Sequence, residues 1–266
     1  MKRKILVVAL GGTIGSTVNG CISLDGNNLR ILQYYDRDGV QFEGVSPFAV
    51  LSENMCVDLW RQLFAFLSSV DYDRYDGVII LHGSDTLAYT AAMVGNAFSD
   101  RRIVLVAADK PLECPDSNGV ANFALAVEHI LGGKTGVFAS YNRMMDSLCI
   151  TSAGMDDDFL SVDGTLPPLG SRTISDRRIL VIQPYVNMDF DCYNTDNIDA
   201  VLIGMYHSAT VPQNAVSFSR RMRARRIPCY FVTHRQSADY ETAQDIDNII
   251  FSCTMENAYA RLLLTK

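Results

Sequence analysis

Two patterns of apolar positions alternate along the chain. Short runs of β-branched and other apolar residues end in glycine or polar residues, and stretches with an apolar residue at every third or fourth position follow them. The first pattern is typical of strands buried on both faces, and the second of helices with one buried face. The alternation therefore predicts an α/β fold with a mostly parallel sheet. The clearest strands of the first half are expected at residues 4–10, 77–81, 103–107 and 135–139.

The second half of the chain repeats the pattern on a smaller scale. Residues 163–176 contain two prolines and two glycines without apolar periodicity, which is typical of a connector. We therefore expect a larger N-terminal domain over residues 1–162, a linker over 163–176 and a smaller α/β domain over 177–266. Strands of the smaller domain are predicted at 179–182, 200–203, 229–232 and 249–251, and Thr254 is expected to cap the final helix.

Composition limits the classes of function. The 266 residues include 23 basic and 30 acidic side chains, and the resulting net charge of −7 repels nucleic acid and anionic membranes. No apolar run approaches the ~20 residues of a membrane-spanning helix, and the initial run MKRKILVVAL fits a buried strand better than a signal peptide. The seven cysteines are scattered without a C-x-x-C pair, which favours reduced thiols and a cytoplasmic location.

The strongest local motif is GGTIG at residues 11–15, directly after the first predicted strand. Ligands bind at the carboxyl ends of strands in open α/β sheets, so Thr13 is expected to lie in a crevice there. The glycines let the backbone approach a ligand closely, and a backbone N–H beside such a turn can stabilise an oxyanion. Taken alone, the motif also fits a tight turn whose hydroxyl group bonds its own backbone.

A second motif, LHGSDTL at residues 81–87, follows a buried strand and opens a helix. This placement brings Ser84 and Asp85 to a second strand end. Asp85 can receive the ammonium group of a substrate, or it can simply stabilise the N-terminus of the helix as a cap. Ser84 can take part in a proton relay or satisfy the loop.

A third motif, LSENM at residues 51–55, precedes another predicted helix. Ser52 and Glu53 can offer a hydroxyl group and a carboxylate to a zwitterionic ligand, while Asn54 can cap the helix. Capping explains each motif singly, but it does not explain the three together.

Through GGTIG, LSENM and HGSDTL, in this order and at similar spacing, the sequence resembles the bacterial-type L-asparaginase family. The resemblance extends more weakly through DSNGVANF and TMENAYARLLL, and so covers nearly the whole chain. It implies a larger N-terminal and a smaller C-terminal α/β domain, hydrolysis of a small amino-acid amide with release of ammonia, no cofactor, and a homodimer or homotetramer.

The resemblance also implies roles for single residues: a threonine nucleophile, a second hydroxyl group with an aspartate that pairs with the substrate's α-amino group, and a serine that binds the α-carboxylate. The catalytic set that it implies is Thr13, Ser84 and Asp85. The substrate-binding set that it implies is Gly12, Ser52, Glu53 and Gly83.

Two positions depart from the family pattern. The family's lysine is expected within Thr-Lys-Thr, and the nearest match is Thr151-Ser152-Ala153, which supplies no cation. A tyrosine expected near residues 20–24 is missing, because the chain has GCISL there. A hydroxyl nucleophile needs an activating group. The alternatives are therefore a weak or inactive amino-acid binder, or an amidase for glutamine or another small amide, and Lys110 is a weaker hypothesis for the missing cation.

Other charged groups favour structural roles. Five arginines between Arg220 and Arg226 are expected at a helix end that faces solvent or another subunit, because cations complement the helix dipole there. His207 is expected to be a loop residue. The four histidines lack metal-ligand spacing, residues 156–158 lack an EF-hand pattern, and the glycines lack a nucleotide-binding pattern, so no metal or cofactor is predicted.

Overall fold

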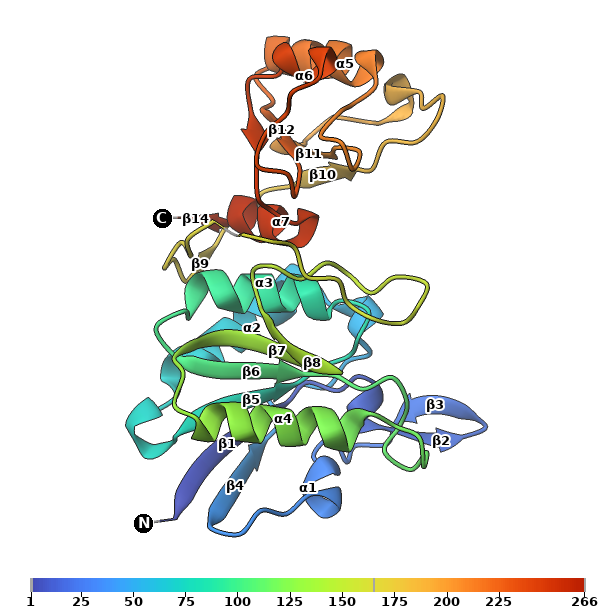
Figure 1. The fold of residues 1–266 in the computed structure, drawn as a ribbon. Coiled ribbons are helices and arrows are strands. Elements are labelled where there is room, and N and C mark those ends of the chain that lie inside the picture. Colours follow the sequence, from blue (N-terminus) through green and yellow to red (C-terminus); the bar gives the residue numbers. More distant parts are fainter. Residues whose placement is uncertain (1, 165, 266) are drawn as a thin grey trace.

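The computed structural model describes residues 2–164 and 166–265. Its larger part is a six-stranded sheet with helices on both faces (Figure 1). In spatial order the strands are β4 (Val40–Val45), β1 (Arg3–Ala9), β5 (Gly77–Leu81), β6 (Arg102–Val106), β7 (Gly136–Tyr141) and β8 (Arg143–Asp146). Every neighbouring pair is parallel except β7 and β8. The predicted α/β fold with a mostly parallel sheet is confirmed.

Two apolar cores lie on opposite faces of this sheet. The covering helices are α2 (Val57–Ser69) and α3 (Leu87–Ala97) on one face, and α1 (Ile31–Tyr34) and α4 (Gly119–Leu131) on the other. Successive strand residues point to opposite faces. Accordingly, Ile80 joins the core under α2 and α3, whereas Leu81 joins the core under α4. Burial on both faces explains why the strand sequences are uniformly apolar.

The order of strands reverses direction at β1. From β1 the chain passes to β4 on one side and then to β5 on the other side, where Ala9 lies beside Leu81. Open α/β sheets bind ligands at the carboxyl ends of strands at such a reversal. GGTIG follows β1 and HGSDTL follows β5, so both motifs begin at this point.

Two features near β1 were not predicted from the sequence. One is the hairpin of β2 (Ser16–Asn19) and β3 (Cys21–Leu24), which projects from the first domain (Figure 1). The other is β4, an edge strand that mixes polar and apolar residues. Both lack the long apolar run that marks the central strands.

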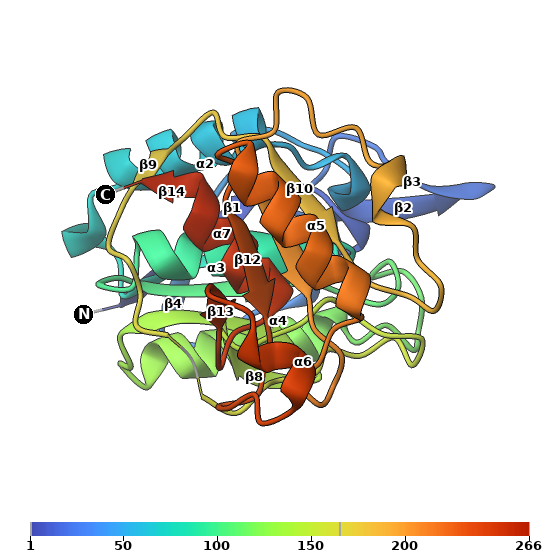
Figure 2. The same cartoon turned by 90° about the horizontal axis from the view of Figure 1, so that it is seen from above.

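The smaller region contains a four-stranded parallel sheet. Its strands, in chain order, are β10 (Ile179–Ile182), β11 (Ala200–Gly204), β12 (Cys229–Val232) and β13 (Ile249–Ile250). Helices α5 (Gln213–Ala224) and α6 (Glu241–Gln244) lie on the side of this sheet away from the first domain (Figures 1 and 2). The predicted strands of this region are thus found to within about one residue at their ends.

The final helix, α7 (Met255–Leu263), lies between the two sheets (Figure 1). Its cap is Thr254, whose hydroxyl oxygen accepts a hydrogen bond from the Asn257 backbone N–H (3.1 Å), as predicted. One side of α7 contributes to the core of the large sheet and the other side to a core beneath β11. The helix therefore joins both regions.

The predicted connector and domain limits stay predictions. The connector includes residue 165, and the two domains end at residues 1 and 266, all of which lie outside the described residues. Within the connector, β9 (Thr173–Ile174) pairs in antiparallel fashion with β14 (Leu264–Thr265). This short sheet ties the connector to the end of α7.

The arginine-rich end of α5 forms ion pairs on the surface. Four of its five arginines pair with an aspartate each: Arg220 with Asp245 (2.9 Å), Arg221 with Asp191, Arg223 with Asp247, and Arg225 with Asp196 (3.1 Å). Exposed pairs add little stability, but they neutralise most of the local positive charge. This arrangement supports the structural role predicted for the run. Within the described ranges, no helix has both the length and the apolar character needed to cross a membrane.

Candidate active site

The loops after β1 and β5 touch through two glycines. Gly12 has φ +75°, and a Cβ atom on it would collide with the backbone of Gly83. A Cβ atom on Gly83 would in turn collide with the Ser52 side chain. The three motifs of the sequence therefore meet at one place. The glycines serve this close packing of backbones, a reason that the sequence alone did not reveal.

Ser52 is held beside the glycines by the segment that precedes it. The Gly12 N–H donates to the Val50 carbonyl (3.1 Å), and Ser52 begins a single 3-10 turn, η2 (Ser52–Asn54). The Thr86 hydroxyl of the third motif donates to the Ser52 carbonyl (2.9 Å). Ser52 is 4% exposed, whereas Glu53 is exposed. The two side chains named for substrate binding in this turn thus differ in their access to solvent.

Four implied site side chains have no protein partner. Thr13 and Ser84 are half-buried, Asp85 and Glu53 are exposed, and none of these side chains hydrogen-bonds or ion-pairs with another residue within the described ranges. The turn of Thr13, η1 (Thr13–Gly15), is therefore not explained by a hydroxyl group that bonds its own backbone. Side chains that are held at strand ends but remain unbonded are available to a ligand.

The capping alternatives are wrong for two residues. Helix α3 is capped at Thr86, one residue after Asp85, and no side chain caps it. Helix α2 is capped at Cys56, because Asn54 belongs to the separate turn η2, and again no side chain caps the helix. The structural explanation of Asp85 as a helix cap is thereby removed.

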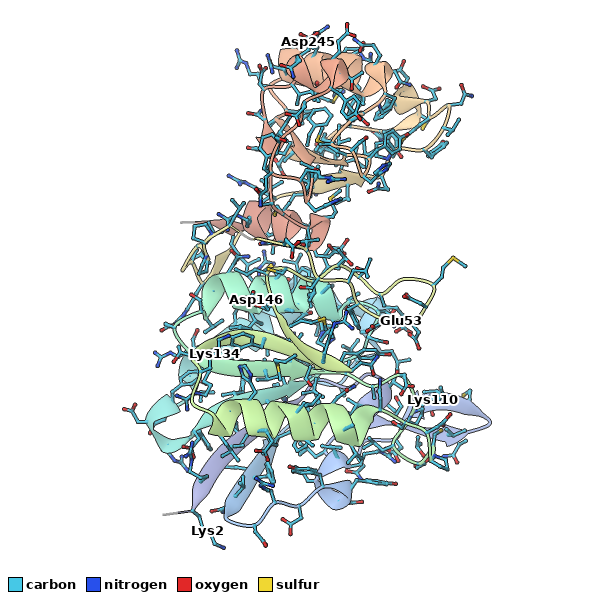
Figure 3. The ribbon with its side chains drawn as sticks, viewed as in Figure 1. Lys2, Glu53, Lys110, Lys134, Asp146 and Asp245 are labelled. Carbon is cyan, nitrogen blue, oxygen red and sulfur yellow. The ribbon has the colours of Figure 1, made fainter. Side chains whose placement is uncertain are left out.

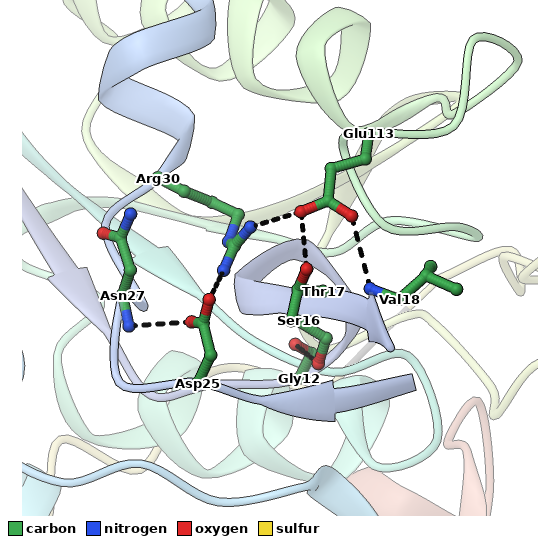
Figure 4. A network of polar contacts seen from close by, with 8 residues as sticks. All are labelled: Gly12, Ser16, Thr17, Val18, Asp25, Asn27, Arg30 and Glu113. Atoms are coloured by element: carbon green, nitrogen blue, oxygen red, sulfur yellow. Dashed lines mark hydrogen bonds and ion pairs between the residues drawn. The ribbon is translucent and has the colours of Figure 1, made fainter. Parts of the chain in front are cut away.

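A network of polar contacts fixes the hairpin that follows Thr13. The Thr17 hydroxyl and the Val18 N–H donate to the two carboxylate oxygens of Glu113 (2.6 and 3.2 Å). Arg30, which is 6% exposed, donates to Glu113 (2.8 Å) and to Asp25 (2.5 Å) (Figure 4). The hydrogen bond from Thr17 is the main cause that lowers the pKa of Glu113, and that to Asp25 raises the pKa of Arg30. We call Thr17, Asp25, Arg30 and Glu113 the hairpin clasp.

The position of the family lysine has a different chemistry. The Ser152 N–H and hydroxyl both donate to one carboxylate oxygen of Glu256 (2.7 Å each), and Glu256 is 6% exposed on α7. Lys110, the other hypothesis for a cation, is exposed and pairs with Asp116, which raises its pKa. Lys110 and Glu53 both lie toward the end of the first domain that carries the hairpin (Figure 3). His207 is an exposed loop residue, as predicted.

One residue of the second motif had no role assigned from the sequence. His82 is 1% exposed, and its Nδ1 lies 2.8 Å from the carbonyl oxygen of Gly83. Its Nε2 is buried without a hydrogen-bond partner within the described ranges. Burial lowers the pKa of His82 to about 4. A polar residue at the end of an apolar strand was the available signal.

Comparison with known proteins places these features in context. The sequence profile described as "Asparaginase, N-terminal" matches residues 4–143. One component of the glutamyl-tRNA(Gln) amidotransferase from Aeropyrum pernix is 28% identical over 138 residues, which are 47% of this chain and 31% of that protein. The aligned region thus spans about a third of that relative's length.

Solved structures resemble the chain over nearly its full length. The thermostable L-asparaginase from Thermococcus kodakarensis has a TM-score of 0.78 at 20% identity, with 98% of this chain and 92% of that one covered. L-asparaginase I from Vibrio cholerae has a TM-score of 0.77 at 20% identity, with 99% and 92% covered. At this level of identity the likeness shows a shared fold.

Proposed function

This chain belongs to the asparaginase family, and from that premise we propose that it hydrolyses the side-chain amide of L-asparagine to aspartate and ammonia. The carrying observation is the contact between Gly12 and Gly83, which joins the loops of Thr13 and Asp85. The side chains of both residues are without protein partners within the described ranges. A nucleophile and a fixed negative charge at neighbouring strand ends suit a substrate with an amide at one end and an ammonium group at the other.

The reaction that we propose has two steps. The Thr13 oxygen attacks the amide carbon, a C–O bond forms, and the C–N bond breaks as ammonia leaves with the hydroxyl proton. Water then cleaves the resulting ester, which releases aspartate and restores the hydroxyl group. The backbone N–H of Thr13, which has no partner in the described part of the chain, would hydrogen-bond the oxyanion.

The remaining residues would bind the zwitterionic end of the substrate. Asp85 pairs with the α-ammonium group, the Ser52 hydroxyl binds the α-carboxylate, and Glu53 adds a second negative charge near the ammonium group. Ser84 supplies a second hydroxyl group beside Asp85. Gly12 and Gly83 leave room for the substrate, because neither carries a side chain.

Exchange of Thr13 tests the nucleophile. In Thr13→Ala we expect ammonia release from L-asparagine to fall by about 1,000-fold or more, because the attacking oxygen is gone. Thr13→Ser is the matched control, since it keeps the hydroxyl group and should retain activity within about tenfold. Circular dichroism checks that both variants remain folded. Full activity in Thr13→Ala would exclude Thr13 as the nucleophile.

A second candidate function is an amino-acid binder with little catalysis. The bond between Ser152 and Glu256 favours it, because the position of the family lysine supplies a hydroxyl group engaged by a buried carboxylate. Calorimetry with L-aspartate and L-asparagine, combined with an ammonia assay over hours, distinguishes the two. Tight binding without ammonia release would favour the binder. Because the Aeropyrum pernix relative is named for a glutamyl-tRNA(Gln) amidotransferase, the assay should include L-glutamine and other small amides.

We also propose that the protein acts in the cytoplasm as a homodimer or homotetramer, as the resemblance implies. Sedimentation velocity at micromolar concentration measures the assembly directly. A monomer under these conditions would contradict this part of the proposal without affecting the assignment of Thr13.

A further inference from the structure

His82 occupies an unusual position for an ionisable group. It follows β5, its backbone N–H donates to the Val106 carbonyl (2.8 Å), and its imidazole is almost completely buried. Its only described hydrogen bond is the one between Nδ1 and the carbonyl oxygen of Gly83, the next residue. The proposed mechanism gives this histidine no task.

The contact fixes the tautomer of the imidazole. A carbonyl oxygen can only accept, so the proton must lie on Nδ1, and Nε2 is left as a buried acceptor. Burial disfavours the imidazolium ion and holds the pKa of His82 at about 4. The ring is therefore a neutral donor with one defined direction at physiological pH.

This donor controls the peptide between Gly83 and Ser84. The chain has no cis peptide bond among its described residues, so the carbonyl of Gly83 and the N–H of Ser84 point in opposite directions. When His82 holds the carbonyl, the Ser84 N–H is turned away from the imidazole. Gly12 packs against the Gly83 backbone and further restricts rotation of the loop. The Ser84 N–H itself has no partner within the described ranges.

We propose that His82 is a positioning residue: through the Gly83 carbonyl it aims the Ser84 N–H at the amide oxygen of a substrate attacked by Thr13. The inference rests on the proposed function. The Ser84 N–H would stabilise the oxyanion together with the Thr13 N–H. Because the oxyanion forms only during the reaction, loss of the aim should lower kcat rather than raise KM.

Two amide side chains separate this role from simple packing. In His82→Asn the side-chain nitrogen falls near the place of Nδ1 and can still donate to Gly83, whereas in His82→Gln it falls nearer to Nε2. We expect His82→Gln to lower kcat about 10- to 100-fold with KM within about threefold, since a lost oxyanion donor costs about 100- to 1,000-fold. His82→Asn should keep kcat within about threefold.

His129→Asn is the control for a histidine exchanged elsewhere. His129 lies on α4, its Nε2 is also buried without a partner within the described ranges, and its ring packs on Phe138. This variant should leave kcat and KM unchanged. Equal losses of kcat in His82→Asn and His82→Gln, or no loss in either, would overturn the proposal.

A second measurement does not depend on turnover. The residual dipolar coupling of the Ser84 N–H reports its direction in the free protein, and we expect the same value in the wild type and His82→Asn but a different value in His82→Gln. An unchanged coupling in His82→Gln would overturn the role of His82 even in an active enzyme. A changed coupling in a protein that cleaves no amide would overturn the proposed function and leave the hold on the peptide established.

Discussion

Gly12 is the residue at which the loops of the site meet, and both its backbone angle and its surroundings require glycine. The positive φ disfavours any L side chain, and the contact with Gly83 leaves no space for a Cβ atom. Gly39 has a similar angle of +78°, but nothing lies within 4 Å of the place where its Cβ atom would be. The two residues therefore separate the cost of the angle from the cost of the contact.

We expect Gly39→Ala to lower the free energy of unfolding by about 1–2 kcal/mol, the usual cost of the left-handed region. Gly12→Ala should cost about 3 kcal/mol or more, because the strand-end loops must also separate. Urea unfolding followed by circular dichroism measures both values. Equal costs in the two variants would mean that the contact with Gly83 contributes nothing to stability.

The buried imidazole of His82 also makes stability depend on pH. The folded pKa of about 4 lies below the ordinary value of 6.5, so between these values the unfolded chain binds a proton that the folded chain does not. Stability should fall as the pH drops from 6.5 toward 4, by about 3 kcal/mol in total from this group. His82→Asn should lose this part of the dependence in urea titrations from pH 4 to 7. Parallel curves for the two proteins would show that His82 titrates normally.

At the scale of elements, the hairpin β2–β3 depends on the hairpin clasp. Val18 and Ile22 are about half exposed (47% and 50%), so the hairpin buries little apolar surface of its own. Its hold on the protein comes from Thr17 and Val18, which both donate to Glu113. Because Arg30 is buried, its positive charge also needs Glu113 and Asp25 as partners.

Glu113→Gln should loosen the hairpin selectively. We expect its amide protons to exchange about tenfold faster or more, while those of β5 stay protected. Glu128→Gln, which changes an exposed partner of Arg37, is the matched control and should leave exchange in the hairpin unaltered. Since the pKa of Glu113 is lowered by its partners, protection in the wild type should be present above pH 4.5 and be lost as the pH falls below that value. Identical exchange maps for the two variants would contradict the clasp.

The elements that could be predicted were those with a signal inside their own sequence. Strands β5 and β12 were predicted at their observed residues, because uniform apolar runs report burial on both faces. The hairpin could not be predicted, because Thr17 finds its partner 96 residues away. The same holds within the site: the three motifs are visible in the sequence, but the collision geometry of Gly12 and the bond of His82 arise only when distant segments fold together.

At the scale of the whole molecule, α7 joins the two sheets through a buried polar contact. The Asn257 side chain accepts from Asn96 of α3 (2.9 Å) and donates to the Leu148 carbonyl (3.1 Å), and both asparagines are fully buried. Trp60, the single tryptophan of the chain, lies near Tyr259 of the same helix, with ring centroids 6.4 Å apart. Its fluorescence should therefore report on this junction.

Asn257→Ala should lower the free energy of unfolding by about 2–3 kcal/mol, because buried polar groups lose their partners. We also expect the Trp60 fluorescence transition to separate from the circular dichroism transition, since the junction weakens before either sheet unfolds. The exposed Asn54→Ala serves as control and should stay within about 0.5 kcal/mol of the wild type. Coincident transitions with unchanged stability in Asn257→Ala would show that the junction is held by apolar packing alone.

The bare backbone crossing at Gly12 and Gly83 also limits how the site can be re-engineered. No side chain can be introduced at the crossing to reshape the pocket wall without driving the loops apart, so directed evolution toward another amide should leave both positions untouched. Adaptable positions are those whose side chains already project freely, namely Glu53, Ser84 and Asp85. A library restricted to these three codons should yield more folded, selectable proteins than one that includes the glycines.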